Sequence, residues 1–257
     1  MTGQFHYEKD SDNIVTVTMD MSGPVNAMND EYIELMSATV ERLQKERDDI
    51  AGVVLTSAKK TFFAGGDIKN MLKAEPGKDE EGLFLMCEEI KGMLAKLEKL
   101  GKPVVAAING AALGGGYEIC LACHHRVALN SPAVQLGLPE VSLGLLPGGG
   151  GIVRLVSKLG VEKAIMPLLE GTRFNVAKAH AAGLIEEVAG TPEEMMTKAK
   201  AWIKPTPRPA TPGMKRASRF PAVICATPRL RRWCRAPFPC CCKRPAGWCR
   251  HRRGFWM

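Results

Sequence analysis

Two glutamates, each beside a cluster of glycines, are the residues of this sequence best placed to do chemistry. Glu118 directly follows residues 109–117, which contain three consecutive glycines, and Glu140 precedes residues 144–151, which end in four. Glycine lacks a Cβ atom, so the oxygen of a ligand can approach its backbone closely. Burial can raise the pKa of a carboxyl group into the range useful for proton transfer. The pattern predicts a site that binds negative charge and moves protons.

The residues around the first glycine cluster predict how it is positioned. Residues 102–108 form a short apolar run opened by a proline, which is typical of a buried strand, and residues 119–123 are typical of an apolar, buried helix. A strand, a glycine turn and a helix N-terminus together offer free backbone N–H groups and a positive dipole end to an anion. A structural reading stays open, in which the glycines only make a tight joint and Glu118 only complements the helix dipole.

The rest of the chain up to residue 203 alternates predicted strands and helices. Further strands are predicted at residues 13–19, 50–56, 126–129, 134–136 and 184–188. One helix is predicted to begin at residue 29, and another to follow a glycine turn at residues 62–69. Further helices are predicted at residues 83–100, 152–159, 161–169, 177–182 and 192–203. Pro167 should kink or shorten the helix that contains it. This alternation predicts an α/β fold with mostly parallel strand pairing.

Charge divides the chain into two parts. Residues 1–203 contain 21 Lys and Arg against 27 Asp and Glu, a net charge of −6, whereas residues 204–257 contain 14 Lys and Arg and no acid. We therefore predict one domain at 1–203 and a poorly ordered basic tail at 204–257. The tail is also rich in proline, cysteine and tryptophan. This bias resembles out-of-frame translation of a GC-rich coding stretch, and a real basic extension is the alternative.

The start of the chain lacks the basic and apolar segments of a signal peptide. No apolar run approaches the roughly 20 residues that span a bilayer. These features predict a cytoplasmic protein without a membrane partner, in which Cys87, Cys120 and Cys123 are free core thiols.

Several motifs in order identify a family resemblance. They are GPVNAM at residues 23–28, FAGGDIK at 63–69, NGAALGGGYE at 109–118, LPE at 138–140, GLLPGGGG at 144–151, LEGTRF at 169–174 and AGLI at 182–185. Residues from about 10 to 203 resemble the crotonase (enoyl-CoA hydratase/isomerase) superfamily, and in particular the hydratase half of bacterial fatty-oxidation fusion enzymes. The resemblance implies a spiral of ββα units that binds an acyl-CoA thioester.

The resemblance also implies a mechanism. The backbone N–H groups of Gly66 and Gly115 would hold the thioester oxygen as it becomes an enolate, in an oxyanion hole. Glu118 would hold and activate a water molecule, and Glu140 would deliver the proton at C2 of a trans-2-enoyl-CoA. Members that only isomerise need the single carboxylate that matches Glu140. Having both favours hydration in fatty-acid β-oxidation, with Δ3–Δ2 isomerisation as a side activity.

The remaining expectations concern the substrate and partners. The residues predicted to bind substrate are Val25, Asn26, Ala27, Ala64, Gly65, Asp67, Ile68, Lys69, Pro139 and Gly148. No cofactor is expected, because coenzyme A is part of the substrate. No metal and no nucleic acid are expected either. Homo-oligomers are typical of the family, and a parent enzyme would carry a 3-hydroxyacyl-CoA dehydrogenase half. The rival hypothesis is an inactive, truncated scaffold whose basic tail binds nucleic acid or another partner.

A possible haem motif, a lysine pair and two departures from the family pattern complete the sequence features. Residues 120–124 match the C-x-x-C-H pattern of haem attachment, but they lie in a predicted apolar helix, so we set haem and zinc aside. The pair Lys59 and Lys60 is either a solvated loop or a contact to the CoA phosphates. His124 stands where the family usually has an aspartate, and the spacing from Glu118 to Glu140 is slightly longer than in the family.

Overall fold

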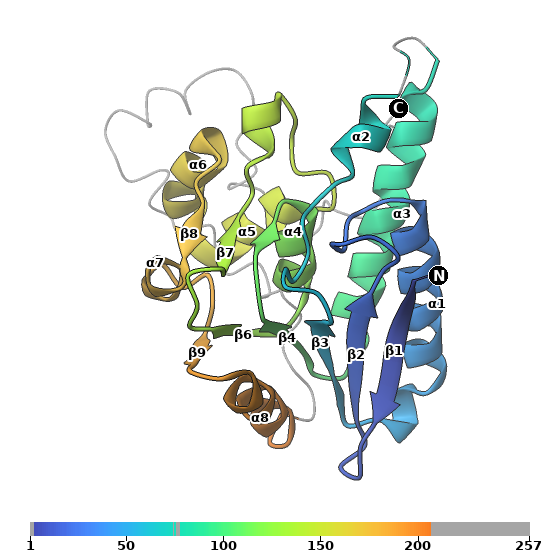
Figure 1. Ribbon diagram of the computed structural model, residues 1–257, viewed down its shortest axis with the longest axis vertical. Helices are drawn as coiled ribbons and strands as arrows, with labels where there is room; N and C mark the ends of the chain where they lie inside the picture. Colours follow the sequence, from blue (N-terminus) through green and yellow to red (C-terminus); the bar gives the residue numbers. More distant parts are fainter. Residues whose placement is uncertain (1–2, 74, 76–77, 207–257) are drawn as a thin grey trace, which may run out of the picture. The chain divides into compact units, whose positions relative to one another are not determined.

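The fold is built on a six-stranded sheet. The computed structural model describes residues 3–73, 75 and 78–206, with only the backbone described at Lys69 and Asn70. The sheet consists, in spatial order, of β1 (Gln4–Lys9), β2 (Ile14–Asp20), β3 (Gly52–Ser57), β4 (Val104–Ile108), β6 (His125–Leu129) and β9 (Glu187–Ala189) (Figure 1). Within this sheet β1 and β2 pair antiparallel, and every other pair of neighbouring strands is parallel. The predicted α/β class with mostly parallel pairing is therefore confirmed.

Helices cover both faces of this sheet, which explains why its central strands β3 and β4 are buried along their whole length. On one face, α8 (Pro192–Ile203) packs against residues such as Val54 and Val105. On the other face lie α1 (Asp30–Lys45), α3 (Glu80–Glu98) and α4 (Gly115–Ala122), which pack over a larger core (Figure 1). Successive residues of β3 and β4 thus belong to two separate clusters.

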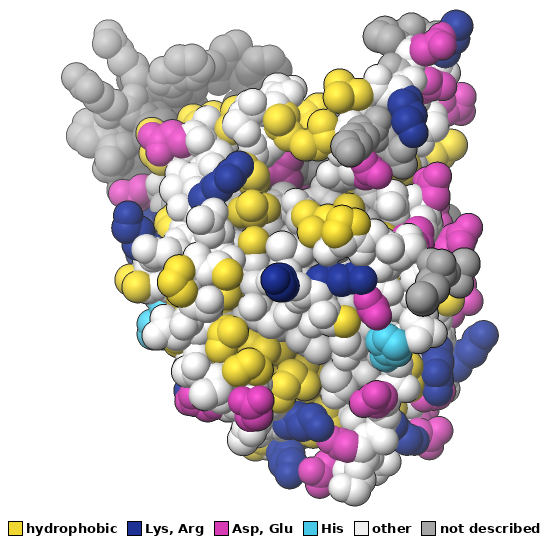
Figure 2. Space-filling view, viewed as in Figure 1, with side chains coloured by type: hydrophobic (Ala, Val, Ile, Leu, Met, Phe, Trp, Pro, Cys, Tyr) yellow, Lys and Arg dark blue, Asp and Glu magenta, His cyan; other side chains and the backbone are white. Residues whose placement is uncertain are grey.

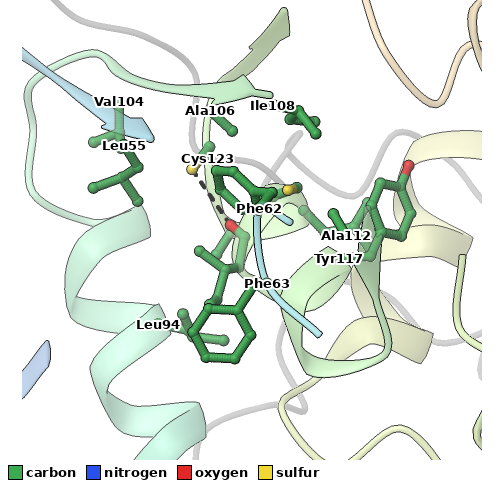
Figure 3. Close-up of a cluster of buried hydrophobic side chains, with 14 of the residues drawn as sticks. Leu55, Phe62, Phe63, Leu94, Val104, Ala106, Ile108, Ala112, Tyr117 and Cys123 are labelled. Carbon is green, nitrogen blue, oxygen red and sulfur yellow. Dashed lines mark hydrogen bonds between the residues drawn. The ribbon is translucent and has the colours of Figure 1, made fainter. Parts of the chain in front are cut away.

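The larger core anchors the loop that follows β3. Phe62 and Phe63 are completely buried among residues of β3, α3 and β4 (Figure 3). The ring of Phe63 also packs edge-on against Tyr32 of α1, with the ring centroids 5.1 Å apart. Because these two aromatic residues cannot shift without opening the core, they fix the start of the glycine turn at residues 64–66.

A smaller three-stranded sheet lies beside the first. Its strands are β5 (Ala112–Leu113), β7 (Gln135–Gly137) and β8 (Phe174–Asn175). The remaining elements are the 3₁₀ turns η1 (Arg47–Asp49) and η2 (Glu140–Leu143) and the helices α2 (Ile68–Met71), α5 (Gly151–Leu159), α6 (Val161–Glu170) and α7 (Val176–Ala181). In the part of the chain that the structure describes, no helix is long and apolar enough to cross a membrane.

Some predicted elements were wrong in detail. Strand β1 was not predicted, and β5 and β8 are too short to give a sequence pattern. The strand expected at 184–188 is β9 at Glu187–Ala189, while Leu184 and Ile185 are buried without strand pairing. Pro167 does not cut its helix short, because α6 continues through it to Glu170. The tail predicted from residue 204 lies, from residue 207 on, outside the described residues.

Candidate active site

One cavity of about 680 Å³ brings together the four residues predicted to be catalytic. Gly66, Gly115, Glu118 and Glu140 all line it, although they come from three separate parts of the chain: the loop after β3, helix α4 and η2. The cavity is otherwise lined mainly by apolar side chains, so a charge inside it is poorly solvated.

Backbone pairing holds the two glycine turns side by side. Phe63 and Ala112 form a parallel bridge, and the N–H of Leu113 donates to the carbonyl of Phe63 at 3.2 Å. Gly65 has a φ of 107°, and a Cβ atom there would lie 3.0 Å from the carbonyl oxygen of Leu113. The contact between the turns therefore requires glycine at position 65.

The N–H groups of Gly66 and Gly115 are left without a protein acceptor among the described residues. Met28 pairs with the residues on either side of Gly66: its N–H donates to the carbonyl of Gly65, and its carbonyl accepts from the N–H of Asp67. The N–H of Gly66 itself takes no part in this pairing. Gly115 is the first residue of α4, where no intrahelical acceptor exists. Two free donors on one cavity, one of them at a helix N-terminus, suit an oxygen that becomes negative.

Glu118 is held rigidly. Its side chain is 2% exposed, and its two oxygens accept hydrogen bonds from the N–H groups of Gly151 at 2.7 Å and Gly149 at 2.9 Å. Burial raises the pKa of Glu118, and the two backbone hydrogen bonds and the charge of Arg154 oppose that shift. A carboxylate with both oxygens bonded in this way has one orientation.

Glu140 is held much more loosely. It is half-buried, and its Oε2 atom, although inaccessible to solvent, has no hydrogen-bond partner among the described residues. Burial and then the negative charge of Glu118 raise the pKa of Glu140 to about 7, against a lowering by its own backbone N–H. A carboxyl group with that pKa is present in both protonation states near neutral pH.

The glycine clusters serve the opposite glutamates from those suggested by their order in the sequence. The later cluster, through Gly149 and Gly151, binds the earlier glutamate, Glu118. Gly114 of the earlier cluster, with a φ of 53°, lies against Glu140, because a Cβ atom there would be 2.8 Å from its Oε1. Sequence adjacency could not reveal this exchange, since it depends on how α5 is packed against α4.

The apolar wall of the cavity was not predicted. One side is a stripe on α3, and the other is the end of η2 with the segment that follows it. The side chains are Leu83, Met86, Cys87, Ile90, Leu143, Leu145 and Leu146. Figure 2 shows hydrophobic side chains gathered along the upper edge of this face, over the region where Figure 1 places α2 and the segment after β7. The spacing of the α3 residues, i, i+3, i+4 and i+7, was a usable indication of a shared face. Cys87 is thus at the cavity rather than in the core, whereas Cys120 and Cys123 are fully buried free thiols.

The predicted substrate-binding residues divide into two groups. Those that line the cavity are Ala64, Gly65, Asp67, Ile68, Pro139 and Gly148. Val25, Asn26, Ala27 and Lys69 are not among its lining residues, and the side chain of Lys69 is outside the description. The side chain of Asn26 is completely buried, where it donates to the carbonyls of Met19 and Phe62 and accepts from the N–H of Met21. It therefore secures the loop before the glycine turn.

The structure gives His124 and Lys59 local roles. The Nδ1 atom of His124 accepts a hydrogen bond from the N–H of Val104, and burial lowers the pKa of His124 to about 4. His124 is therefore neutral, and its hydrogen bond joins the segment after α4 to the start of β4. Lys59 forms an ion pair with Asp20, with 2.6 Å between Nζ and Oδ1, and neither residue lines the cavity. No group of side chains within the described residues could hold a metal ion.

The fold and the cavity define an α/β protein with one buried and one half-buried carboxyl group beside two free backbone donors. A family model described as enoyl-CoA hydratase/isomerase matches residues 9–210. The chain therefore belongs to the enoyl-CoA hydratase/isomerase (crotonase) family, as its motifs predicted. The chain is 36% identical over 217 residues to the fatty acid oxidation complex subunit alpha of Idiomarina loihiensis, an alignment that covers 84% of this chain and 30% of that protein.

Solved structures agree with this assignment. The enoyl-CoA hydratase of Bacillus anthracis superposes with a TM-score of 0.70 at 30% identity, covering 79% of this chain and 76% of that one. DspI of Pseudomonas aeruginosa superposes with a TM-score of 0.68 at 29% identity, covering 78% and 73%. The crotonase fold predicted from the sequence is confirmed.

Proposed function

We propose that this chain is an enoyl-CoA hydratase that adds water to a trans-2-enoyl-CoA in fatty-acid oxidation. The observation that carries the proposal is the contrast inside one cavity between the fixed Glu118 and the partner-free Oε2 of Glu140, both beside the free N–H groups of Gly66 and Gly115. Hydration needs these parts: a group that holds water, a group that supplies a proton, and donors for the thioester oxygen.

The steps follow from this arrangement. The thioester oxygen accepts hydrogen bonds from Gly66 and Gly115, which draws electrons from C3. Glu118 orients water toward C3 and takes one of its protons as the C–O bond forms. The resulting enolate collapses as protonated Glu140 gives its proton to C2. The raised pKa of Glu140 favours the form that has this proton.

The wider context is also part of the proposal. The match to a fatty acid oxidation complex subunit supports a thioester of a fatty acid as substrate, and a dehydrogenase half as the partner activity in a longer parent protein. Coenzyme A enters with the substrate, so no further cofactor is required by these steps. Isomerisation of Δ3 to Δ2 double bonds would need only Glu140 and the donors.

The test is steady-state hydration of crotonyl-CoA by the wild type, Glu140→Gln and Glu118→Gln, with Glu89→Gln on the exposed face of α3 as control. Each site variant should lose roughly 10²- to 10⁴-fold in kcat, and the control should keep the wild-type rate. Isomerisation of trans-3-hexenoyl-CoA should survive better in Glu118→Gln than in Glu140→Gln. Equal hydration by wild type and Glu140→Gln would remove the acid–base assignment.

A further inference from the structure

A buried ion pair lies behind the loop that holds Glu118. Arg154 of α5 donates from Nη2 to an oxygen of Glu98 at 3.0 Å, and from Nε to the same oxygen at 3.3 Å. Both side chains are 10% exposed. Glu98 is at the end of α3, so the pair joins the two helices on either side of Glu118.

The third contact of Arg154 reaches the loop itself. Its Nη1 donates to the carbonyl of Gly149 at 2.8 Å, and the N–H of Gly149 is one of the two donors to Glu118. The loop wraps closely around the guanidinium, because Gly150 has a φ of 92° and a Cβ atom there would lie 2.6 Å from Nη1. A chain of contacts therefore runs from Glu98 through Arg154 and Gly149 to Glu118.

We propose that Arg154, held in place by Glu98, is a positioning residue that fixes the Gly149 amide and thereby the carboxylate of Glu118. The inference rests on the proposed function for its catalytic consequence, but not for its structural one. The planar guanidinium provides donors to Glu98 and to Gly149 at once, which a lysine cannot do with the same geometry. A buried ion pair is weak as a source of stability alone, since apolar replacements of similar size are often as stable.

The charges around Glu118 define what its titration would report. Burial is the main cause of the raised pKa of Glu118, Glu140, Cys87 and Tyr32; the charge of Arg154 opposes this rise at Glu118, whereas the charge of Glu118 adds to it at the other three groups. Arg154 is the cation among these groups, which come from α5, η2, α3 and α1. Removal of its charge should therefore move the titration of Glu118 to higher pH.

The variants separate positioning from stability. Arg154→Met leaves Glu98 buried and unpaired, and it should lose both stability and activity. Glu98→Met/Arg154→Met removes both charges and should recover thermal stability. Its kcat for crotonyl-CoA should stay reduced, by up to roughly 100-fold, with KM nearly unchanged, because Glu118 is misplaced. Lys158→Met, one turn along α5 at the ion pair with Glu186, is the matched control and should keep the wild-type kcat.

A readout without substrate makes the inference independent of hydratase activity. In protein labelled with ¹³C at the glutamate carboxyl carbons, the signal missing from Glu118→Gln identifies Glu118, and its titration is followed by NMR. Both Met variants should shift its midpoint to higher pH, and Lys158→Met should not. An unmoved midpoint in the double variant overturns the proposal, as does recovery of kcat together with stability. If the wild type hydrates no enoyl-CoA while the midpoint shifts, the proposed function fails and the coupling of Arg154 to Glu118 stands.

Discussion

Glu118 and Glu140 share a residue type and a cavity but differ in almost every physical respect. Glu118 is buried in a helix, with both oxygens bound by the amides of Gly149 and Gly151. Glu140 begins a 3₁₀ turn, is half-buried and keeps one oxygen without a partner. Burial raises the pKa of both; at Glu118 two glycine amides and the charge of Arg154 oppose the rise, whereas at Glu140 only its own backbone N–H opposes it and the charge of Glu118 adds to it.

This difference shows how one fold obtains two functions from one type of side chain. An acid that holds water in a fixed position benefits from a single orientation, which the two amides impose on Glu118. An acid that delivers a proton needs a pKa near the working pH, which desolvation and a neighbouring charge give to Glu140. The mechanism we propose uses each carboxyl group in the role that its surroundings favour.

Among changes that keep both glutamates, the largest effect should come from adding one methyl group beside each carboxylate. In Gly151→Ala the new Cβ would lie 2.8 Å from both Cγ and Oε1 of Glu118, and in Gly114→Ala it would lie 2.8 Å from Oε1 of Glu140 at a strained φ. We expect each to lower kcat for crotonyl-CoA by roughly 100-fold, because a displacement near 1 Å at the reacting atoms has that cost.

The matched control is Gly92→Ala on α3, where a Cβ atom meets nothing within 4 Å. It should keep the wild-type kcat and gain about 0.4 to 1 kcal/mol in stability, as is usual for this change in a helix. If Gly151→Ala were as active as Gly92→Ala, Glu118 would not need its fixed orientation.

The next effect concerns pH. Hydration consumes no net proton, so the active enzyme must carry one proton on the pair in both directions: on Glu140 before hydration and on Glu118 after it. Because the pKa of Glu140 is raised to about 7, kcat/KM should fall about tenfold per pH unit above that value. Rates of crotonyl-CoA hydration from pH 5 to 9 should therefore give a bell-shaped profile of kcat/KM. A kcat/KM that stays constant from pH 7 to 9 would contradict protonated Glu140 as the proton donor.

The smallest effect is on stability, and it should differ in sign between the two sites. The folded-state pKa of Glu140 is raised above its ordinary value, so its contribution is present below about pH 4.5 and lost as pH rises through about 7. At pH 8, Glu140→Gln should therefore be more stable than wild type by about 1 to 2 kcal/mol, a value reduced for solvent screening at a half-buried side chain.

At the same pH, two effects oppose each other in Glu118→Gln: the raised pKa of Glu118 favours a neutral replacement, whereas a glutamine leaves one of the two glycine amides without an acceptor. We expect the lost acceptor to dominate and Glu118→Gln to be less stable than wild type by about 1 to 3 kcal/mol, because a buried donor without a partner has a cost of that size. Urea unfolding at pH 8 measures both differences, and at pH 4.5 the advantage of Glu140→Gln should vanish. The same sign for both variants at pH 8 would mean that the two sites are not electrostatically distinct.

The sequence by itself determined the fold class and marked the glycine turns and the two glutamates that line the cavity. Apolar strands such as residues 102–108 require burial on two sides, and the glycine runs mark places where backbone comes close to other atoms. Both properties are local, so they can be recognised without knowing the partners. The family motifs added the identity of Gly66, Gly115, Glu118 and Glu140, which the structure places on one cavity.

Only the tertiary structure decided which glycine cluster serves which glutamate. Gly149 and Gly151 bind Glu118 across more than 30 residues of sequence, because α5 packs with its first turn against α4. The apolar wall from α3, the buried Asn26 and the Arg154–Glu98 pair depend on long-range packing in the same way. Burial, and with it the pKa of a carboxyl group, is a property of all the atoms around that group, so it exists only once the chain has folded.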